Sequence, residues 1–531
     1  MSQPTRLPTD ATGDARVAQL HDDVLALRAE LDRVRTAGTH GYYLSPAARK
    51  DWLHLRRIPD EGLAADAAKT IVQDAHTLDF DHRLNTASYV NVAMDAQESA
   101  IVLMGMRVNL ADQTVYPRSY RLHDVTLNMI ADLWNCPRPA DFDEYGVYPG
   151  AGTVGSTEAC LLSGLALKFR WRDWYAKRRG TSVEQVLGVR PNLVISTCYQ
   201  AAWEKLFKYM DIEPRLIQPL VNEFTMDPAE VGGAIDERTI GVVGIMGNHY
   251  GGQYDPIAEI DQAVEQVNAE RGFQVGIHVD AASGGFVAPF QDDIPPWDFR
   301  LKNVLSISAS GHKYGEACCG TGWVVWRERP GLGEHVAVDV TYLGGKAHSY
   351  TLNFSRPASG VYDQYYKFLH YGIAGYRRAS DNMMENARYI RDGLKAMTHK
   401  GKPRFRLLDN GDEGCLPVVA AMLTPEFGRQ YDDIDLQHVI SQHHWYVGSY
   451  RMEYHHPLSG ERKPLFRDAD ADSTMFRIVV KSNLTRNMAG HLIESIEEAV
   501  QLLDSIVHSE HRRFEAHDLR HKDQRRFTRH C

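Results

Sequence analysis

The chain has 531 residues, which is more than one typical domain, so we expect a large core and at least one smaller domain. Hydrophobic residues make up 43% and charged residues 24%, as in ordinary water-soluble globular proteins, and a formal net charge of −10 argues against a general affinity for nucleic acid. We expect no membrane contact, because the sequence contains neither an apolar stretch of about 20 residues nor a signal-peptide core.

Apolar residues near the start of the chain alternate spacings of three and four, which predicts a helix that packs on another helix. They are Val17, Leu20, Val24, Leu27, Leu31 and Val34. The surface that receives this helix is either its own domain or a second subunit. We assign residues 1–84 to an N-terminal helical segment.

From about Asn85 to Val325, apolar strand-like runs alternate with longer helical patterns. This alternation predicts an α/β fold with a mostly parallel sheet that is covered on both faces. The predicted strands are 193–196, 240–246, 275–279, 304–308 and 323–326. Ligands of such sheets bind beyond the carboxyl ends of the strands. His249, Asp280 and Lys313 each follow one of these runs, so we expect them to face one crevice.

The pattern changes after about Tyr376 and predicts a smaller α+β domain, with strands near 416–423 and 476–480 and a helix near 489–507. We therefore assign residues 85–375 to a large domain and residues 376–507 to a small C-terminal domain. Pro457 to Ser473 is polar and charged, which predicts a surface loop. The basic, histidine-rich tail at 508–531 is either a solvated end, or a contact or lid that responds to pH.

The seven cysteines are scattered apart from Cys318-Cys319 and form neither a disulfide framework nor a zinc spacing. We therefore expect a cytoplasmic protein with reduced thiols and no metal site.

The run SISASGHKYG carries Lys313 at the end of an apolar strand, and HVDAASGGF carries Asp280 at the end of the preceding one. A buried lysine can condense with an aldehyde to form an imine, and a carboxylate beside it can keep a pyridine nitrogen protonated. Both partners are needed by pyridoxal 5′-phosphate. A glycine-rich turn before a helix, Gly150 to Ala159, supplies Ser156 and Thr157 as candidate phosphate ligands, although many ordinary helices start in this way.

Together with YLGG and NFSRP further along, these motifs resemble the group II amino-acid decarboxylases that depend on pyridoxal phosphate, and the glutamate decarboxylase branch in particular. The resemblance extends from about Asn85 to about Ser482. It implies fold type I, the aspartate-aminotransferase-like fold. It also implies a homodimer or higher homo-oligomer in which two subunits complete each active site.

By the same resemblance, Lys313 and Asp280 hold the cofactor ring, and Gln200 and Ala282 lie against its two faces. Ser310 and His312 join Ser156 and Thr157 at the phosphate, and Ser355 reaches it across the subunit interface. His249 departs from the family, which usually has threonine at this position. Because histidine is larger and can donate or accept a proton, we expect the packing near the cofactor or substrate to differ from that of the family.

The resemblance assigns substrate binding to Ser88, Tyr89 and Arg477, together with Asn109 and Asp112 of the facing subunit. Ser88-Tyr89 stands where the family typically has Thr-Phe. Tyr342, flanked by glycines, is the expected donor of a proton to the α-carbon after carbon dioxide leaves, and His312 is expected to assist Lys313.

We therefore expect a decarboxylase that converts an L-amino acid into an amine and carbon dioxide, with glutamate as the leading substrate and 4-aminobutyrate as its product. An uncharged amino acid such as valine, leucine or methionine is the alternative substrate. An aminotransferase or lyase would share Lys313 and Asp280, and a non-catalytic scaffold would use the N-terminal helix and the basic tail.

Overall fold

The computed structural model describes residues 20–28, 46–140, 142, 146–221, 223–328, 338–340, 347–409, 411, 414–425 and 431–506. The chain divides into two compact units, Met1–Asp81 and His82–Cys531. The first unit contains a helix at 20–28, the 3-10 turn η1 (Pro46–Arg49) and helix α2 (Ala65–Thr77). The predicted N-terminal helix is thus confirmed over residues 20–28, where its apolar residues are exposed. Its other predicted positions and the tail at 508–531 lie outside the described residues.

The second unit is built on a seven-stranded sheet with the strand order β1-β7-β6-β5-β4-β2-β3. β7 runs antiparallel to both of its neighbours, whereas the pairs from β6 to β3 are parallel. The five strands predicted from the sequence are confirmed within this sheet. The strands are β1 (Gly150–Val154), β2 (Asn192–Ser196), β3 (Glu213–Ile217), β4 (Thr239–Ile245), β5 (Gly276–Asp280), β6 (Val304–Ala309) and β7 (Thr321–Trp326).

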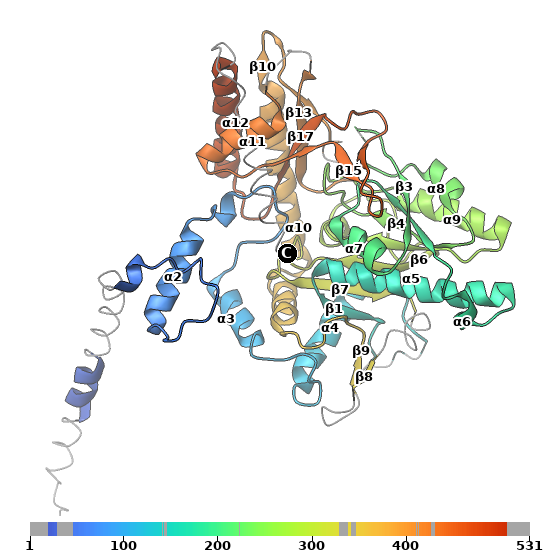
Figure 1. Cartoon of the computed structure of the whole chain (residues 1–531), viewed down its shortest axis with the longest axis horizontal. Helices are drawn as coiled ribbons and strands as arrows, with labels where there is room; N and C mark the ends of the chain where they lie inside the picture. Colours follow the sequence, from blue (N-terminus) through green and yellow to red (C-terminus); the bar gives the residue numbers. More distant parts are fainter. Residues whose placement is uncertain are drawn as a thin grey trace, which may run out of the picture. The chain divides into compact units, whose positions relative to one another are not determined.

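Alternating residues of the buried strands pack on opposite faces of the sheet, because successive side chains of a strand point to opposite sides. Leu193, Ile195 and Val243 pack with the helices of one face, and Val194 and Val242 with those of the other. Figure 1 shows the sheet in the middle of these helices. The first face is covered by α5 (Gly155–Arg179), α6 (Val183–Val186) and α7 (Ala201–Tyr209), and the second by α4 (Pro117–Leu133), α8 (Pro228–Ala234) and α9 (Ile257–Arg271).

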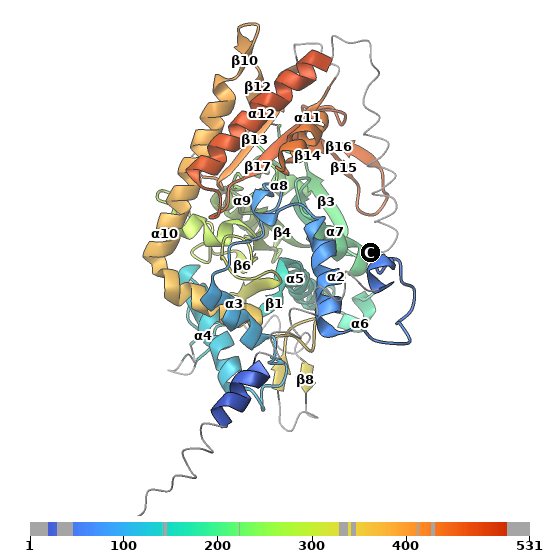
Figure 2. The same ribbon diagram turned by 90° about the vertical axis from the view of Figure 1, so that its left-hand side faces the viewer.

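A long helix, α10 (Ser359–Ala396), leads from the large sheet into the C-terminal part of the chain (Figure 2). It is broken at Gly372, whose φ of 54° and ψ of −178° are not helical. The predicted domain boundary at 375/376 falls beside this break, and the division into domains remains a prediction. Near its start, α10 packs against α3 (Ala96–Gly105).

The C-terminal part contains a four-stranded antiparallel sheet with the order β12-β13-β17-β14, as the α+β pattern predicted. Its strands are β12 (Phe405–Leu407), β13 (Val418–Leu423), β14 (Gly448–Arg451) and β17 (Thr474–Val479), and its helices are α11 (Asp433–Ile440) and α12 (Arg486–Ile506). Short elements complete the unit: η2 (His82–Leu84), η3 (Gly284–Phe286), η4 (Ala288–Phe290), η7 (Ser441–His443), β8 (Val338–Val340), β9 (Ala347–Ser349), β10 (Thr398–His399) and β11 (Lys402–Pro403).

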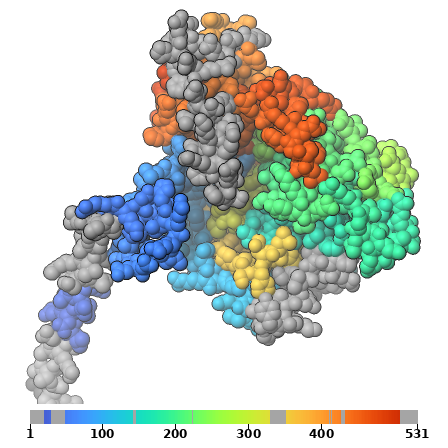
Figure 3. Space-filling model, viewed as in Figure 1, coloured from blue at the N-terminus to red at the C-terminus, as the bar shows by residue number. Residues whose placement is uncertain are grey.

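The prediction of a surface loop at 457–473 is wrong for part of that range. A hairpin forms from β15 (Glu453–His455) and β16 (Arg462–Pro464). The two residues that follow it, Leu465 and Phe466, are completely buried. Phe466 lies edge-on to Phe224 at 5.0 Å between ring centres, which anchors the segment beside the loop between β3 and α8. Figure 3 shows this orange-red segment lying against the green surface of an earlier part of the chain.

In the part of the chain that the structure describes, no helix is long and apolar enough to cross a membrane.

Candidate active site

Five strand ends meet at one edge of the large sheet, as expected for parallel strands. β1, β2, β4, β5 and β6 run in the same direction, so the residues after their carboxyl ends share this edge. Residues predicted to form the site lie at or just after the ends of all five strands: Ser156, Gln200, His249, Asp280 and Lys313. The prediction that the last three face one crevice agrees with this arrangement.

The amino group of Lys313 lies in an enclosed part of this edge. Its Nζ donates to Ser283 Oγ at 3.2 Å and lies 5.3 Å from the centre of the Tyr89 ring. Burial lowers the pKa of Lys313 to about 8, although the nearby Asp280 carboxylate opposes this shift. A lysine with a lowered pKa has more of the neutral amine that attacks an aldehyde.

Asp280 is the last residue of β5, and its carboxylate is 4% exposed. Oδ2 accepts a hydrogen bond from Trp203 Nε1 at 2.7 Å, and Oδ1 accepts one from the Ala282 backbone N–H at 3.1 Å. Two residues earlier on the same strand face, His278 is held by hydroxyl groups of β6, and burial lowers its pKa to about 3. The neutral His278 therefore supports the Asp280 strand without adding charge.

A turn suited to phosphate lies at the start of α5. Gly155 has φ of 76°, a conformation that side chains disfavour, and a Cβ added there would lie 3.5 Å from His312 Cε1. The His312 ring is thus adjacent to the turn that carries Ser156, which is buried, and Thr157, which is half-buried. Burial lowers the pKa of His312 to about 4, and its Nδ1 donates to the Thr321 carbonyl oxygen at 2.6 Å. His312 is therefore neutral, with the Nε2 lone pair free of the proton.

Tyr89 brings the lysine and the predicted substrate arginine together. Its ring contacts both side chains: Lys313 Nζ lies 5.3 Å and the guanidinium carbon of Arg477 lies 4.8 Å from the ring centre. Its hydroxyl donates to the His249 carbonyl oxygen at 3.0 Å. Arg477 also donates to this carbonyl and to the Ala87 carbonyl oxygen, so it joins the N-terminal segment of the site to β17. Ser88, beside Tyr89, accepts the Val90 N–H.

A cavity of about 440 Å³ opens beside Gln200 and His249. Its other lining residues come from the segment after β2, from α7, from the segment after β4 and from β15: Thr197, Tyr199, Ala201, Glu204, Tyr250, Glu453, Tyr454 and His455. Burial lowers the pKa of His249 well below its ordinary value, so this imidazole is neutral at physiological pH. The hairpin that the sequence did not predict therefore forms one wall beside the candidate site.

The residues predicted to act on the facing subunit form a separate group. Asn109 Nδ2 donates to Ser355 Oγ at 3.4 Å, and Asn109 Oδ1 accepts the Arg356 N–H at 3.2 Å. Asp112 is half-buried in the same segment, and its carbonyl oxygen accepts the Tyr116 N–H at 2.9 Å. The side chain of Asn109 thus contacts Ser355 and Arg356, and not Lys313 of the same chain. Tyr342 lies outside the described residues.

Sequence reasoning missed several residues of this site. Trp203 follows Gln200 by three positions, which places it on the first turn of α7, but nothing in the sequence connects an indole to Asp280. His278 could have been found from strand alternation, because it lies two residues before Asp280. Tyr450 was also missed; its hydroxyl accepts from Arg477 at 2.7 Å.

The site fits pyridoxal 5′-phosphate. Ser310 Oγ and His249 Nδ1 are enclosed and have no hydrogen-bond partner, so polar atoms remain available in the crevice. A lysine with a lowered pKa, a buried aspartate on the adjacent strand and a glycine turn at a helix start supply the three contacts that the cofactor requires. Fold and site together define a pyridoxal-phosphate enzyme of fold type I.

Comparisons with known proteins agree with this class. Residues 53–416 match the pyridoxal-dependent decarboxylase conserved domain. The probable glutamate decarboxylase gamma of Listeria innocua is 35% identical over 461 residues, which cover 87% of this chain and 91% of that protein. The glutamate decarboxylase of Lactococcus lactis subsp. cremoris is 34% identical over 448 residues, or 84% and 90% of the two chains.

A solved structure of the Lactobacillus brevis glutamate decarboxylase has a TM-score of 0.77 and 35% identity, and the match covers 87% of this chain and 98% of that one. The chain therefore belongs to the pyridoxal-dependent decarboxylases. It is a decarboxylase that uses pyridoxal 5′-phosphate.

Proposed function

We propose that the protein decarboxylates L-glutamate at the α-carbon, giving 4-aminobutyrate and carbon dioxide. The observation that carries the substrate is the 35% identity, over most of both chains, to proteins described as glutamate decarboxylases. The site chemistry supports the reaction type, because Lys313 and Asp280 lie at adjacent strand ends with a phosphate turn nearby.

When bound, pyridoxal phosphate supplies an electron-withdrawing ring that accepts the electrons of the broken carbon–carbon bond. In this proposal Lys313 binds the cofactor aldehyde, and Asp280 keeps the ring nitrogen protonated. Ala282 and Gln200 pack on the ring. Because a neutral His312 has an acceptor nitrogen beside the phosphate turn, it can accept a hydrogen bond there.

Five further residues have roles at the phosphate and the substrate in this proposal. Ser156, Thr157 and Ser310 bind the phosphate, and the orphan hydroxyl of Ser310 supports this role. Arg477 holds a substrate carboxylate; its Nε is enclosed without a partner, although its terminal nitrogens already bind carbonyl oxygens. Tyr342 protonates the α-carbon in this proposal, which rests on the sequence.

The proposed enzyme is a homodimer or higher homo-oligomer in the cytoplasm. Asn109, Asp112 and Ser355 then serve the site of the partner subunit, a role supported by their grouping with one another. Exposed apolar side chains nearby also favour a covering second copy. They lie at the end of α3, before α10 and on α10: Leu103, Met104, Met106, Leu352, Phe354, Leu369 and Ile373.

A decarboxylase for an uncharged amino acid is the second candidate. The described residues that line the cavity beside His249 include two glutamates, Glu204 and Glu453, but no lysine or arginine. A pocket of this charge does not attract an acidic side chain. His249 itself is neutral, so it adds no positive charge.

The test is release of carbon dioxide by the cofactor-loaded protein from each of the twenty amino acids in turn, with Lys313→Ala as the control. We expect release from glutamate and loss of the cofactor absorbance band in the control. Release of carbon dioxide from an uncharged amino acid alone would overturn the assignment of glutamate as the substrate. Absence of release from any amino acid would contradict decarboxylation itself.

A further inference from the structure

A cavity of about 730 Å³ opens at the edge of the large sheet opposite to the edge that carries Asp280 and Lys313. Its lining comes from α5, from α9, from the starts of β5 and β6, and from the end of β7. β5 runs from Gly276 in this lining to Asp280 at the other edge, over about 13 Å of extended chain. Ligand sites in proteins enclose about 300–1,000 Å³, so the cavity has room for an organic molecule that does not touch the cofactor residues.

Two arginines in the lining bind carbonyl oxygens and not carboxylates. Arg170 of α5 donates from Nη1 to the Gln274 carbonyl oxygen at 2.5 Å. Arg327, directly after β7, donates to backbone carbonyl oxygens through Nε and Nη2. Within the described part of the chain neither guanidinium group forms an ion pair, and Nη2 of Arg170 and Nη1 of Arg327 have no acceptor. Burial lowers the pKa of both groups, although nearby acidic groups oppose the shift.

The other charged residues of the lining do not neutralise these arginines. Lys302 Nζ lies 2.6 Å from Glu265 Oε1, so these two charges form a pair. Glu328 is exposed, and among the described residues no ion pair joins it to either arginine. With three basic and two acidic side chains, the lining has a charge of +1. An anion is therefore the favoured occupant.

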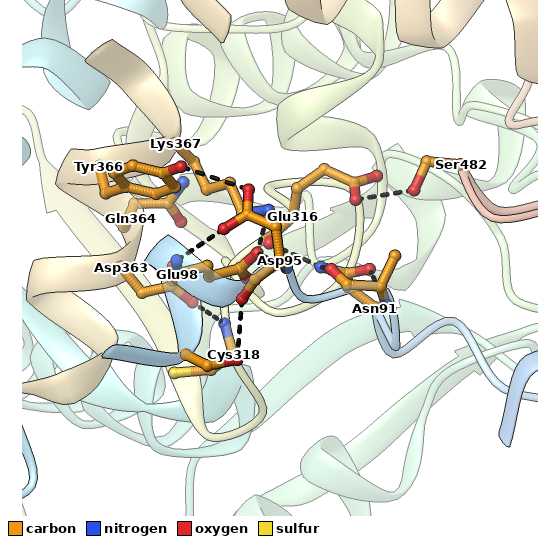
Figure 4. A network of polar contacts seen from close by, with 12 residues as sticks. Asn91, Asp95, Glu98, Glu316, Cys318, Asp363, Gln364, Tyr366, Lys367 and Ser482 are labelled. Atoms are coloured by element: carbon orange, nitrogen blue, oxygen red, sulfur yellow. Dashed lines mark hydrogen bonds and ion pairs between the residues drawn. The ribbon is translucent and has the colours of Figure 1, made fainter. Parts of the chain in front are cut away.

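Two buried charged residues elsewhere in the same unit have side-chain partners (Figure 4). Lys367 Nζ donates to Glu98 Oε2 at 2.7 Å, and both side chains are no more than 3% exposed. Glu316, three residues after Lys313, is also buried, and its carboxyl group accepts from Ser482 Oγ at 2.8 Å. The arginines of the cavity differ from these residues, because no side chain in the described part of the chain accepts from them.

The indole of Trp326 gives an independent indication of a ligand. Trp326 is the last residue of β7, lines the cavity and is 4% exposed. Its Nε1 is enclosed and has no acceptor among the described residues. A buried indole N–H usually has a hydrogen-bond acceptor, and a buried donor without one costs free energy. An oxygen atom of a ligand in the cavity would supply the missing acceptor.

Apolar side chains line the cavity beside these donors. They come from α5, from α9, from the turn before β5 and from β6: Ala166, Leu167, Ala269, Phe273 and Leu305. A small inorganic anion has no apolar surface to place against them and would fill little of the space. The lining therefore fits a larger molecule that combines an acidic group with a flat apolar body.

We propose that this cavity is a second ligand site of the enzyme and that it binds an organic anion. The acidic group of the ligand contacts Arg170, Arg327 and the Trp326 indole, and its flat body lies against the apolar lining. Binding here is separate from the decarboxylation proposed above, because none of these three residues belongs to the cofactor or substrate contacts.

The experiment is calorimetric titration of the cofactor-loaded protein with adenosine 5′-monophosphate, which combines an acidic group with a flat ring. We expect one molecule to bind per chain while the cofactor absorbance band stays unchanged. Adenosine, which lacks the acidic group, should bind at least about tenfold more weakly, because hydrogen bonds to charged groups are the stronger ones. A Kd above about 10 mM for the monophosphate, equal binding of adenosine, or loss of the cofactor band would each overturn the proposal.

Arg170→Gln tests the cation, with a matched control on the same helix. Arg178 also lies on α5 and donates to the carbonyl oxygens of Arg271 and Gly272, but it does not line the cavity. We expect Arg170→Gln to raise the Kd for the monophosphate by about tenfold or more, and Arg178→Gln to leave it within about twofold. Equal Kd values for the two variants would contradict the site.

Trp326→Phe tests the indole donor. Phenylalanine keeps an aromatic ring but removes the N–H, so the monophosphate should bind about fivefold more weakly, whereas adenosine should bind within about twofold of its wild-type Kd. A wild-type Kd for the monophosphate, or an equal loss for adenosine, would refute the contact between the acidic group and the indole. Arg170→Gln keeps the site testable if Trp326→Phe does not fold, because Arg170 is only half-buried.

Discussion

Replacing Trp203 by phenylalanine tests how the buried Asp280 carboxylate is held. The indole N–H donates to Asp280 Oδ2 at 2.7 Å, and both side chains are buried. Phenylalanine keeps an aromatic ring but removes this donor, so Oδ2 loses the indole hydrogen bond and the Ala282 N–H still binds Oδ1. A hydrogen bond to a charged group contributes about 1.5–3 kcal/mol, which corresponds to about 10- to 150-fold in a binding constant.

We expect the loss to weaken cofactor binding, because the carboxylate must then be ordered when the ring nitrogen arrives. The assay is titration of the cofactor-free variant with pyridoxal phosphate, followed by absorbance. Trp171→Phe is the matched control: its indole donates to the Glu237 carbonyl oxygen at 3.0 Å, before the start of β4 and so at the opposite edge of the sheet. If Trp203→Phe binds the cofactor within twofold of wild type, or if Trp171→Phe weakens it equally, the reasoning is refuted.

Arg477→Lys keeps the charge, but a single ammonium group cannot serve the carbonyl oxygens of Ala87 and His249 as the planar guanidinium does. We expect the free energy of unfolding, measured by urea titration, to fall by about 1–3 kcal/mol, and KM for the substrate to rise. Unchanged values of both would contradict the role of Arg477. Asp409→Asn breaks a buried ion pair with Arg391, whose Nε lies 2.7 Å from the carboxylate. It should lower the free energy of unfolding by about 3–5 kcal/mol, and a loss below about 1 kcal/mol would count against a buried charge pair.

Much of the fold could be predicted because the strands of the large sheet are buried on both faces. Such strands appear as continuous apolar runs, and parallel strand ends necessarily share an edge. Asp280 and Lys313 could therefore be predicted from the sequence to lie at the same edge of the sheet. The hairpin at 453–464 could not, because the two apolar residues that anchor it, Leu465 and Phe466, stand within a charged stretch.

The polar supports of the site escaped prediction for a different reason. A glutamate in a sequence is most often a solvated charge, so nothing marks Glu316 as buried until α3 and α10 are packed around it. The partner of Trp203 is likewise determined by tertiary packing, since α7 and β5 are distant in the chain. Motifs identified the groups that meet the cofactor, whereas the groups that hold them in place depend on contacts between distant segments.

The break in α10 has a mechanical consequence. The half before Gly372 carries Lys367, which binds Glu98 of α3, and the half after it carries Arg391, which binds Asp409 in the segment between β12 and β13. The backbone at Gly372 occupies a region essentially reserved for glycine. Any rotation of one half against the other is therefore absorbed by two torsion angles at a single residue, and not by bending spread along a rod of 38 residues.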